Sequence, residues 1–147
     1  MISSVNHVSF TVSNLNQSIT FYRDVLGMEC ISMAERDKEF SSAVTGIDGV
    51  EMNIAYMQAP GFAVELIQYV SGEGTKIDTS TNNPGSAHLC FNIGDYDEWM
   101  KRMEECNVKM CGKLCHVPAG PNEGKRVCYM LDNDGNHLEF IEASKQE

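Results

Sequence analysis

Alternation between apolar and polar residues marks the first predicted strand, Val5 to Val12. Val8, Phe10 and Val12 fall on one side of such a strand, and His7 falls on the other. A period of two is the pattern of a strand with one buried face. The chain therefore opens with a strand that carries a histidine on its polar side.

The period then changes to that of an amphipathic helix, with apolar residues at Leu15, Ile19, Tyr22 and Leu26. Ser13 or Asn14 can cap the start of this helix, and Gly27 fits its end. From about Cys30 to Met57 the pattern is mixed but strand-like, with turns expected at Gly46 and Gly49. Pro60-Gly61 predicts another turn, and Phe62 to Val70 a further strand.

The polar segment 71–85 is rich in Gly, Thr, Asn and Pro and predicts a linker or a mobile loop. The pattern then starts again. A strand is predicted at Ala87 to Ile93 and a helix at Asp95 to Cys106, with Trp99 and the methionines as core residues. Further strands are predicted near Val108, at Arg126 to Leu131 and at His137 to Glu142, with a tight turn at Asp132 to Gly135 between the last two.

The second half repeats the first. His7-Val8-Ser9-Phe10-Thr11-Val12 corresponds to His88-Leu89-Cys90-Phe91-Asn92-Ile93, and Val64-Glu65-Leu66-Ile67 corresponds to Leu138-Glu139-Phe140-Ile141. Each half thus runs from a strand with His, through a helix, to a last strand with Glu. We predict an α+β fold of two paired βαβββ modules, residues 1–70 and 86–147, joined by the linker 71–85. Each module is too small to fold alone, so we expect the two to share a core.

The repeat places two histidines and two glutamates at corresponding positions: His7, Glu65, His88 and Glu139. Glu65 shares its strand face with Ala63, Ile67 and Tyr69, and an ionised carboxylate on such a face is costly unless a cation or hydrogen bonds compensate it. A single His or Glu on a strand is most often an ordinary surface residue. Its recurrence in both halves favours a metal site. Two imidazoles and two carboxylates suit Zn, Ni, Co, Mn or Fe(II), and such a set leaves coordination positions open for water or substrate.

Composition narrows the class of protein. The 147 residues carry a net charge of −10, and no cluster of Lys and Arg offsets it, so nucleic acid is not an expected partner. No secretory signal and no apolar run long enough to span a membrane is visible. We therefore expect a cytoplasmic protein whose six cysteines are reduced.

Several motifs together resemble the vicinal oxygen chelate superfamily, which includes glyoxalase I, methylmalonyl-CoA epimerase, extradiol dioxygenases and the bleomycin and fosfomycin resistance proteins. They are Asn6-His7-Val8, Phe21-Tyr22 through Val25-Leu26-Gly27-Met28, Val64-Glu65-Leu66, Ala87-His88-Leu89 and Asp134-Gly135-Asn136-His137-Leu138-Glu139. The resemblance covers nearly the whole chain. It implies that two βαβββ modules form a curved sheet around one divalent metal per chain, Ni, Co, Zn or Mn rather than Fe(II).

The resemblance also implies a chemistry and a set of roles. The four ligands are those of glyoxalase I and the epimerase, and they carry over to His7, Glu65, His88 and Glu139. We expect a lyase or isomerase that removes a proton next to a carbonyl, with Glu139 as the first candidate for the base and Glu65 as the second. The expected substrate is a small molecule, a glutathione or coenzyme A thioester among the candidates, and the expected assembly is a homodimer.

Two other functions stay open at this point. An Fe(II) extradiol-type dioxygenase uses only two His and one Glu, so Glu65 argues against it. A non-catalytic drug-binding protein often lacks the ligands that this chain retains. The stretch 31–50 does not match the glutathione-contacting region of glyoxalase I, where only Arg36 is a stand-in, and Lys125 or Arg126 could meet an anionic group or simply lie in a solvated hairpin.

Other signals carry less weight. Cys111, Cys115 and His116 resemble half of a zinc site, but no second pair has the required spacing. Asp132 to Asn136 resembles the start of a calcium loop but lacks its later ligands, so a turn is the better interpretation. His137 lies two residues before Glu139, on the same strand face, and is a runner-up ligand.

Overall fold

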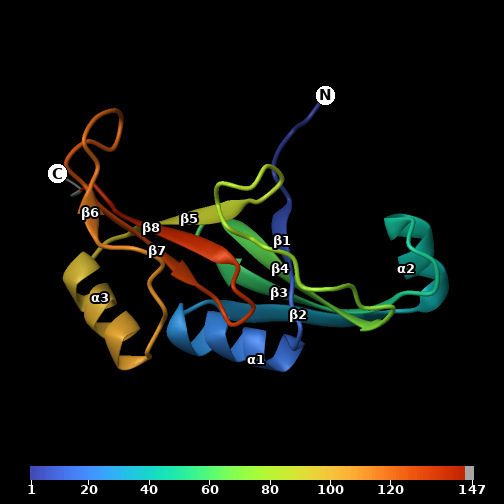
Figure 1. Cartoon of the computed structure of the whole chain (residues 1–147). Helices are drawn as coiled ribbons and strands as arrows, with labels where there is room; N and C mark the ends of the chain where they lie inside the picture. The colour runs from blue at the N-terminus through green and yellow to red at the C-terminus, as the bar shows by residue number, and fades with distance from the viewer. Residues whose placement is uncertain (145–147) are drawn as a thin grey trace. The chain divides into compact units, whose positions relative to one another are not determined.

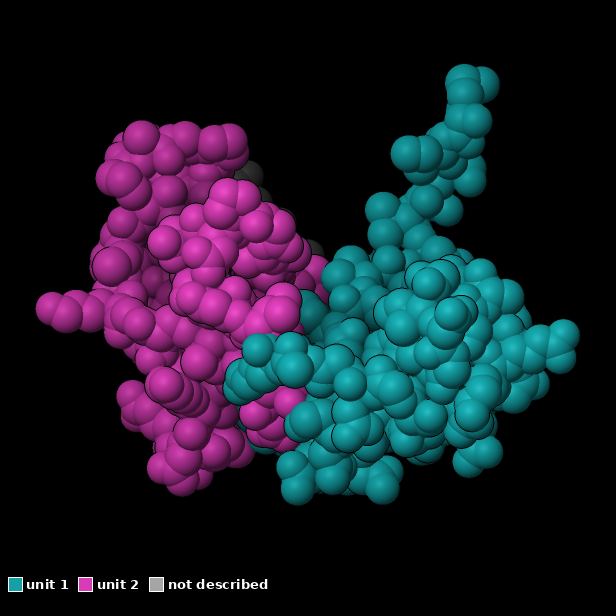
Figure 2. Space-filling model, turned by 45° about the vertical axis from the view of Figure 1, so that its right-hand side comes forward, with its two compact units in different colours: residues 1–76 teal, residues 77–147 magenta. Residues whose placement is uncertain are grey.

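The computed structural model describes residues 1–144, and the chain divides into two compact units, residues 1–76 and the residues from 77 onward. Figure 1 labels the helices and strands of both units, and Figure 2 colours the first unit teal and the second magenta. Each unit contains its own four-stranded sheet. The predicted α+β fold of two βαβββ-type units is confirmed.

The sheet of the first unit has the strand order β1-β4-β3-β2. Its strands are β1 (His7–Thr11), β2 (Glu29–Arg36), β3 (Glu51–Ala59) and β4 (Phe62–Ser71). The first strand lies parallel to β4, whereas the other neighbours are antiparallel. This order brings the predicted His strand next to the predicted Glu strand.

One helical segment connects β1 to β2. It starts as α1 (Leu15–Thr20) and continues as one π-helical stretch, η1 (Phe21–Val25). Of the two predicted caps, Asn14 is the one used: its side-chain oxygen accepts a hydrogen bond from the Gln17 backbone N–H at 3.0 Å. Gly27 follows the helix with a φ of 79°, a left-handed conformation that favours glycine.

A second helix in this unit, α2 (Lys38–Thr45), was not predicted, because the sequence of that region was interpreted as strand-like. It begins at a capping residue, Asp37, whose carboxylate accepts a hydrogen bond from the Phe40 backbone N–H, and ends at Gly46 with a φ of 73°. The unit is therefore a βαβββ module with one extra helix between β2 and β3. The turns predicted at Gly46 and Gly49 are present, and both residues have positive φ.

The second unit repeats this design without the extra helix. Its strand order is β5-β8-β7-β6, formed by β5 (His88–Ile93), β6 (Cys115–His116), β7 (Arg126–Leu131) and β8 (His137–Glu142). The first strand is again parallel to the last. The strand expected near Val108 is reduced to a single bridge between Met110 and Met130, followed by the short β6.

The helix of the second unit, α3 (Tyr96–Glu105), is capped by Asp95 and ends at Cys106. Its buried residues are Tyr96 and Met103, and the Trp99 ring lies 4.4 Å from the Phe140 ring of β8. These contacts confirm that the apolar face of this helix packs into the core. No helix in residues 1–144 is long and apolar enough to cross a membrane.

The core of each unit lies on one face of its last strand. Val64 and Leu66 in β4 are completely buried, and so is Leu138 in β8. Since successive side chains of a strand point to opposite faces, the residues between them, Glu65 and Glu139, lie on the other face. The fold thus places each glutamate on the face opposite the apolar core.

Candidate metal centre

The first unit joins His7 to Glu65. Residue 65 is paired with Ser9 in the parallel ladder between β1 and β4, so the His7 side chain is one pleat away on the same face. The imidazole Nε2 lies 3.2 Å from Oε2 of Glu65. The carboxylate is nearly buried, with a side chain 11% exposed, whereas the imidazole is 32% exposed.

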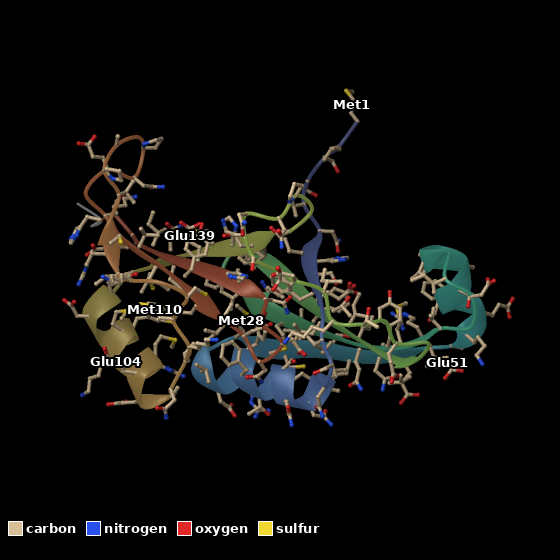
Figure 3. All side chains as sticks on the ribbon, viewed as in Figure 1. Met1, Met28, Glu51, Glu104, Met110 and Glu139 are labelled. Carbon is tan, nitrogen blue, oxygen red and sulfur yellow. The ribbon has the colours of Figure 1, made fainter. Side chains whose placement is uncertain are left out.

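The second unit joins His88 to Glu139 in the same way. Glu139 is paired with Cys90 in the ladder between β5 and β8, and His88 Nε2 lies 3.1 Å from Glu139 Oε2. Glu139 is labelled in Figure 3, where it lies on β8 beside β5. Its side chain is 20% exposed and so is more open than that of Glu65.

Asn6 contacts the other ring nitrogen of His7. His7 Nδ1 lies 2.7 Å from Oδ1 of Asn6. When Nδ1 donates to this amide oxygen, Nε2 of the neutral imidazole presents its lone pair toward Glu65, 3.2 Å away. A lone pair on Nε2 in this direction is what a metal ion bound beside Glu65 would use.

The spacing of both pairs also suits a divalent metal. Metal bonds to His nitrogen and carboxylate oxygen are about 2.0–2.2 Å long, so two neighbouring ligands at a right angle are roughly 3 Å apart. The nitrogen–oxygen distances of 3.2 Å and 3.1 Å match this separation. Imidazole nitrogen with carboxylate oxygen is a donor set for Zn, Ni, Co, Mn or Fe(II).

Each carboxylate has a further donor on the neighbouring strand. The Ser9 hydroxyl donates to Glu65 Oε2 at 3.1 Å. The equivalent position in the second unit holds Cys90, whose pKa is raised to about 12 by burial, by the charge of Glu139 and by a hydrogen bond with that carboxylate. Cys90 is therefore a neutral thiol at physiological pH, a weak donor rather than a nucleophile.

Two tyrosines that were not predicted from the sequence lie beside the His–Glu pairs. Tyr56 in β3 is paired with Glu65, and Tyr129 in β7 is paired with Glu139. Each sits directly across a hairpin from the glutamate, and the turns at Pro60-Gly61 and at Asp132 to Gly135 set this register. The tyrosines could have been found from the sequence, because residues equally distant from a hairpin turn lie opposite each other on the two strands.

His137 has no counterpart in the first unit. It is paired with His88, at the position that Ala63 holds opposite His7. Its Nδ1 atom is buried and has no hydrogen-bond partner among residues 1–144. Asp78 lies close enough to His137 for the imidazole to contribute to lowering the pKa of that carboxyl, after the larger contributions of hydrogen bonds from Ser80 and Asn83.

The basic residues considered for an anionic substrate have protein partners. Arg126 hydrogen-bonds to Asp97 and Glu142, and its guanidinium lies 4.8 Å from the centre of the Tyr96 ring. Lys125 donates to Asn122 at 2.9 Å. Arg36 lies over the Phe40 ring at 5.8 Å. All six cysteines are free thiols.

Within neither unit do three or more His, Cys, Asp or Glu side chains of the described residues gather to hold a metal ion. That finding gives no support to Cys111, Cys115 and His116 as a zinc site, or to His137 as a third ligand beside His88 and Glu139. Each unit supplies one imidazole and one carboxylate.

Comparison with known proteins agrees with the fold. Residues 4–140 match the profile of the Glyoxalase/Bleomycin resistance protein/Dioxygenase superfamily. The chain belongs to this superfamily. The resemblance stated from the sequence motifs is thereby confirmed for nearly the whole chain.

Characterised relatives within the superfamily have different activities. The metallothiol transferase FosB of Staphylococcus haemolyticus is 26% identical over 150 residues, which cover 100% of this chain and 88% of that protein. A 2-epi-5-epi-valiolone epimerase from an Actinomyces species is 24% identical, covering 94% of this chain and 78% of its own length. The lactoylglutathione lyase of Schizosaccharomyces pombe is also 24% identical, over 96% of this chain and 48% of the larger enzyme.

Solved structures show the same fold. A glyoxalase family protein from Bacillus cereus superposes with a TM-score of 0.83 at 21% identity, over 97% of this chain and 95% of that one. The fosfomycin resistance protein FosX from Listeria monocytogenes, in complex with Mn(II) and sulfate, superposes with a TM-score of 0.66 at 21% identity, over 99% of this chain and 96% of that one.

Proposed function

We propose that this protein is a divalent-metal-dependent lyase or isomerase that moves a proton next to a carbonyl group, with the metal held by His7, Glu65, His88 and Glu139. The observation that carries the proposal is the pair of His–Glu contacts, at 3.2 Å and 3.1 Å, made at the same register in both units. A chance contact between a surface His and Glu has no reason to recur at the repeated position. A shared ligand gives that reason.

The relatives support a metal and a proton transfer. FosX is known in complex with Mn(II), and FosB is named as a metallothiol transferase. An epimerase and a lyase are both among the relatives. Removal of a proton beside a carbonyl is a first step that both kinds of reaction can share.

The metal, when bound, supplies Lewis-acid stabilisation of the negative charge that develops on a substrate oxygen. Glu139 is our first choice for the base, because its side chain is the more exposed of the two carboxylates, at 20% against 11%. Its neighbour Cys90 is also a weaker donor than the Ser9 hydroxyl beside Glu65. Glu139 is therefore the carboxylate that can more easily turn toward a substrate, and Glu65 is the second choice.

The substrate class we favour is a small thioester or thiol adduct, with glutathione or coenzyme A as the carrier. Two relatives are named for thiol chemistry, the metallothiol transferase and the lactoylglutathione lyase. Ni, Co, Zn or Mn is the expected metal. We further expect a cytoplasmic homodimer, and light scattering in solution checks the oligomeric state.

Thiol transfer is the second candidate function. It is favoured by the FosB relative, which matches this chain along its entire length. In such a reaction a thiol adds to a small electrophile that the metal holds, and no proton is exchanged at a carbon next to a carbonyl. The two functions therefore leave different marks on the substrate.

The test uses protein loaded in turn with Ni, Co, Zn, Mn and Fe(II) in deuterated buffer. Hemithioacetals of glutathione and 2-methylacyl thioesters of coenzyme A are supplied, and NMR follows deuterium entering the carbon next to the carbonyl. We expect exchange with wild type and a loss of about 10²-fold or more in Glu139→Gln, the usual contribution of a general base. Glu73→Gln, on an exposed residue of the same chain, is the matched control and keeps full exchange.

Other outcomes identify the alternatives. Consumption of a thiol with an epoxide electrophile, without exchange, would replace proton transfer by thiol transfer. Oxygen consumption with a catechol in the Fe(II)-loaded protein would move the assignment to a dioxygenase. Absence of every activity, with tight binding of a drug-like ligand, would make the protein a binding module.

A further inference from the structure

A tyrosine contacts each His–Glu pair. It comes from the strand that forms a hairpin with the glutamate strand, β3 in the first unit and β7 in the second. The two tyrosines, Tyr56 and Tyr129, occupy the same place in the repeat, since each is paired across its hairpin with the glutamate of its own unit. Neither residue is part of the ligand set. The repetition extends beyond the ligands themselves, to the groups that contact them.

In the second unit the phenol contacts the imidazole directly. The Tyr129 hydroxyl lies 3.2 Å from His88 Nε2, the atom that also lies 3.1 Å from Glu139. The two rings meet edge to face, with centroids 5.1 Å apart at 70°. The hydroxyl also hydrogen-bonds to Glu139, so it is placed to donate to either member of the pair.

In the first unit the ring contact repeats, but the phenol hydroxyl meets the carboxylate and not the imidazole. The Tyr56 hydroxyl hydrogen-bonds to Glu65, and the Tyr56 ring meets the His7 ring edge to face, with centroids 5.5 Å apart at 82°. His7 has in addition its own support from Asn6 at Nδ1. Tyr129 and Glu139 both contact His88 at Nε2, so these two groups orient that imidazole.

Both phenols can act as hydrogen-bond donors toward the pairs. A phenol hydroxyl has one hydrogen to donate, and with an ordinary tyrosine pKa of about 10 it keeps that hydrogen at neutral pH. Imidazole nitrogen and carboxylate oxygen are both acceptors for such a donor.

We propose that Tyr56 and Tyr129 are matched positioning residues, whose hydroxyls hold the His and Glu of each unit in the orientation that receives a divalent metal. The proposal rests on the proposed function, since it assigns a role toward the metal. A donor placed beside two acceptors reduces their repulsion before the metal arrives. His88 would hold the metal through Nε2, and the Tyr129 hydroxyl would then keep the Glu139 carboxylate as its acceptor.

The hydroxyl and the ring make separable contributions. A Tyr→Phe change keeps the edge-to-face ring contact and removes only the donor. Partners that orient metal ligands contribute about 10–100-fold to metal affinity in other proteins. We expect Tyr129→Phe to weaken metal binding about 10-fold or more, within that range, and Tyr56→Phe to weaken it less, because Asn6 still orients His7.

Tyr69 provides the matched control. It lies on the same strand face as Glu65, four residues further along β4, and is paired across the hairpin with Met52. Tyr69→Phe therefore removes a phenol hydroxyl from the same sheet without touching either pair. We expect it to bind metal as wild type does.

The experiment measures metal affinity of wild type, the three Phe variants and the Tyr56→Phe, Tyr129→Phe double variant by calorimetry with Ni, Co, Zn and Mn. The Co(II) absorption spectrum reports the ligand geometry. Nitrogen-15 NMR of the metal-free protein reports the His88 tautomer, which Tyr129→Phe is expected to release from a single form. A merely structural role would lower the melting temperature while leaving the dissociation constant, the cobalt spectrum and the tautomer as in wild type.

The outcomes separate this proposal from the proposed function. Weaker metal binding and an altered cobalt spectrum in Tyr129→Phe, with Tyr69→Phe unchanged, support it. Wild-type metal binding in the Tyr56→Phe, Tyr129→Phe double variant overturns the positioning role and leaves the metal centre intact. A wild-type protein that binds none of the four metals overturns both.

Discussion

The two units hold the same pair of side chains, a His and a Glu, in different surroundings. Both place an imidazole and a carboxylate on neighbouring parallel strands, and both add a tyrosine from the next strand. The first unit surrounds its pair with Ser9, Ala63 and the support of Asn6, whereas the second has Cys90 and His137. The first unit also has longer second, third and fourth strands and the extra helix α2. The shared residues are those that the proposed metal centre requires, and the differing residues are those that can tune one side of it.

The first prediction concerns the apolar core of each unit, in which a substitution can open a cavity. Leu66 in the first unit and Leu138 in the second are both completely buried. We expect Leu66→Ala and Leu138→Ala each to destabilise the fold by about 2–5 kcal/mol, through lost burial and the cavity left behind. Differential scanning calorimetry should show both variants lowering one common transition. A variant that leaves part of the transition at the wild-type temperature would show that the units unfold independently.

The second comparison concerns the turns that set the register of each glutamate. The buried carboxylate of Asp132 accepts hydrogen bonds from the backbone N–H groups of Asp134 and Asn136 and from the Asn136 side chain. The Pro60-Gly61 turn is supported instead by Gln58, whose amide donates to two backbone carbonyls. Asp132→Ala should cost about 1–3 kcal/mol, since it leaves three part-buried donors without their acceptor. Urea titration should show a smaller loss for Gln58→Ala and for the conservative Asp132→Asn, and equal losses would contradict the comparison.

The third prediction uses the thiol that replaces Ser9 in the second unit. Because the pKa of Cys90 is raised to about 12, the reactive thiolate is scarce at pH 8, and its fraction rises only as the pH approaches that value. Cys90 and Cys106 are both exposed, but peptide mapping after iodoacetamide treatment should show Cys90 labelled more slowly, because its pKa is the raised one. Glu139→Gln removes a neighbouring charge that raises this pKa, and so should speed the labelling of Cys90 without abolishing the effect of burial. Equal labelling of Cys90 in both proteins would show that Glu139 does not act on it.

The smallest effect is expected at the position where the units differ most. His137 stands where the first unit has Ala63, and its buried Nδ1 makes no hydrogen bond to any of the described residues. His137→Ala should therefore bind metal with the wild-type dissociation constant by calorimetry, because no ligand and no positioning contact is lost. A clear loss of affinity would mean that the second unit holds the metal with a third group.

Much of the fold was predictable from local patterns. The alternation in residues 7–12 and in residues 88–93 identifies two strands and puts each histidine on the polar face, because side-chain direction along a strand follows directly from its period. The helix α2 was missed for a related reason. Its apolar residues Phe40 and Val44 are exposed, so they do not mark a buried face that a helical period could reveal.

The contacts around the metal ligands depend on pairing between strands. The sequence identified His7 and Glu65 by their repetition, but it did not reveal that Tyr56 lies opposite Glu65, because that neighbour is fixed by hairpin register. The roles of Ser9 and Cys90 were missed for the same reason, since parallel pairing of distant strands brings them to the glutamates. The identity of the metal is set by ligand geometry and supply, which a list of residues does not contain.

The most direct test of the account is the metal content of the purified protein by elemental mass spectrometry, with His7→Ala and His88→Ala measured beside wild type. The account predicts one Ni, Co, Zn or Mn ion per chain in wild type and loss of that ion in both variants, because each unit contributes half of the ligands. Retention of the ion in one variant would show that a single unit holds it. Absence of metal from wild type, even after soaking with each ion, would contradict the central claim.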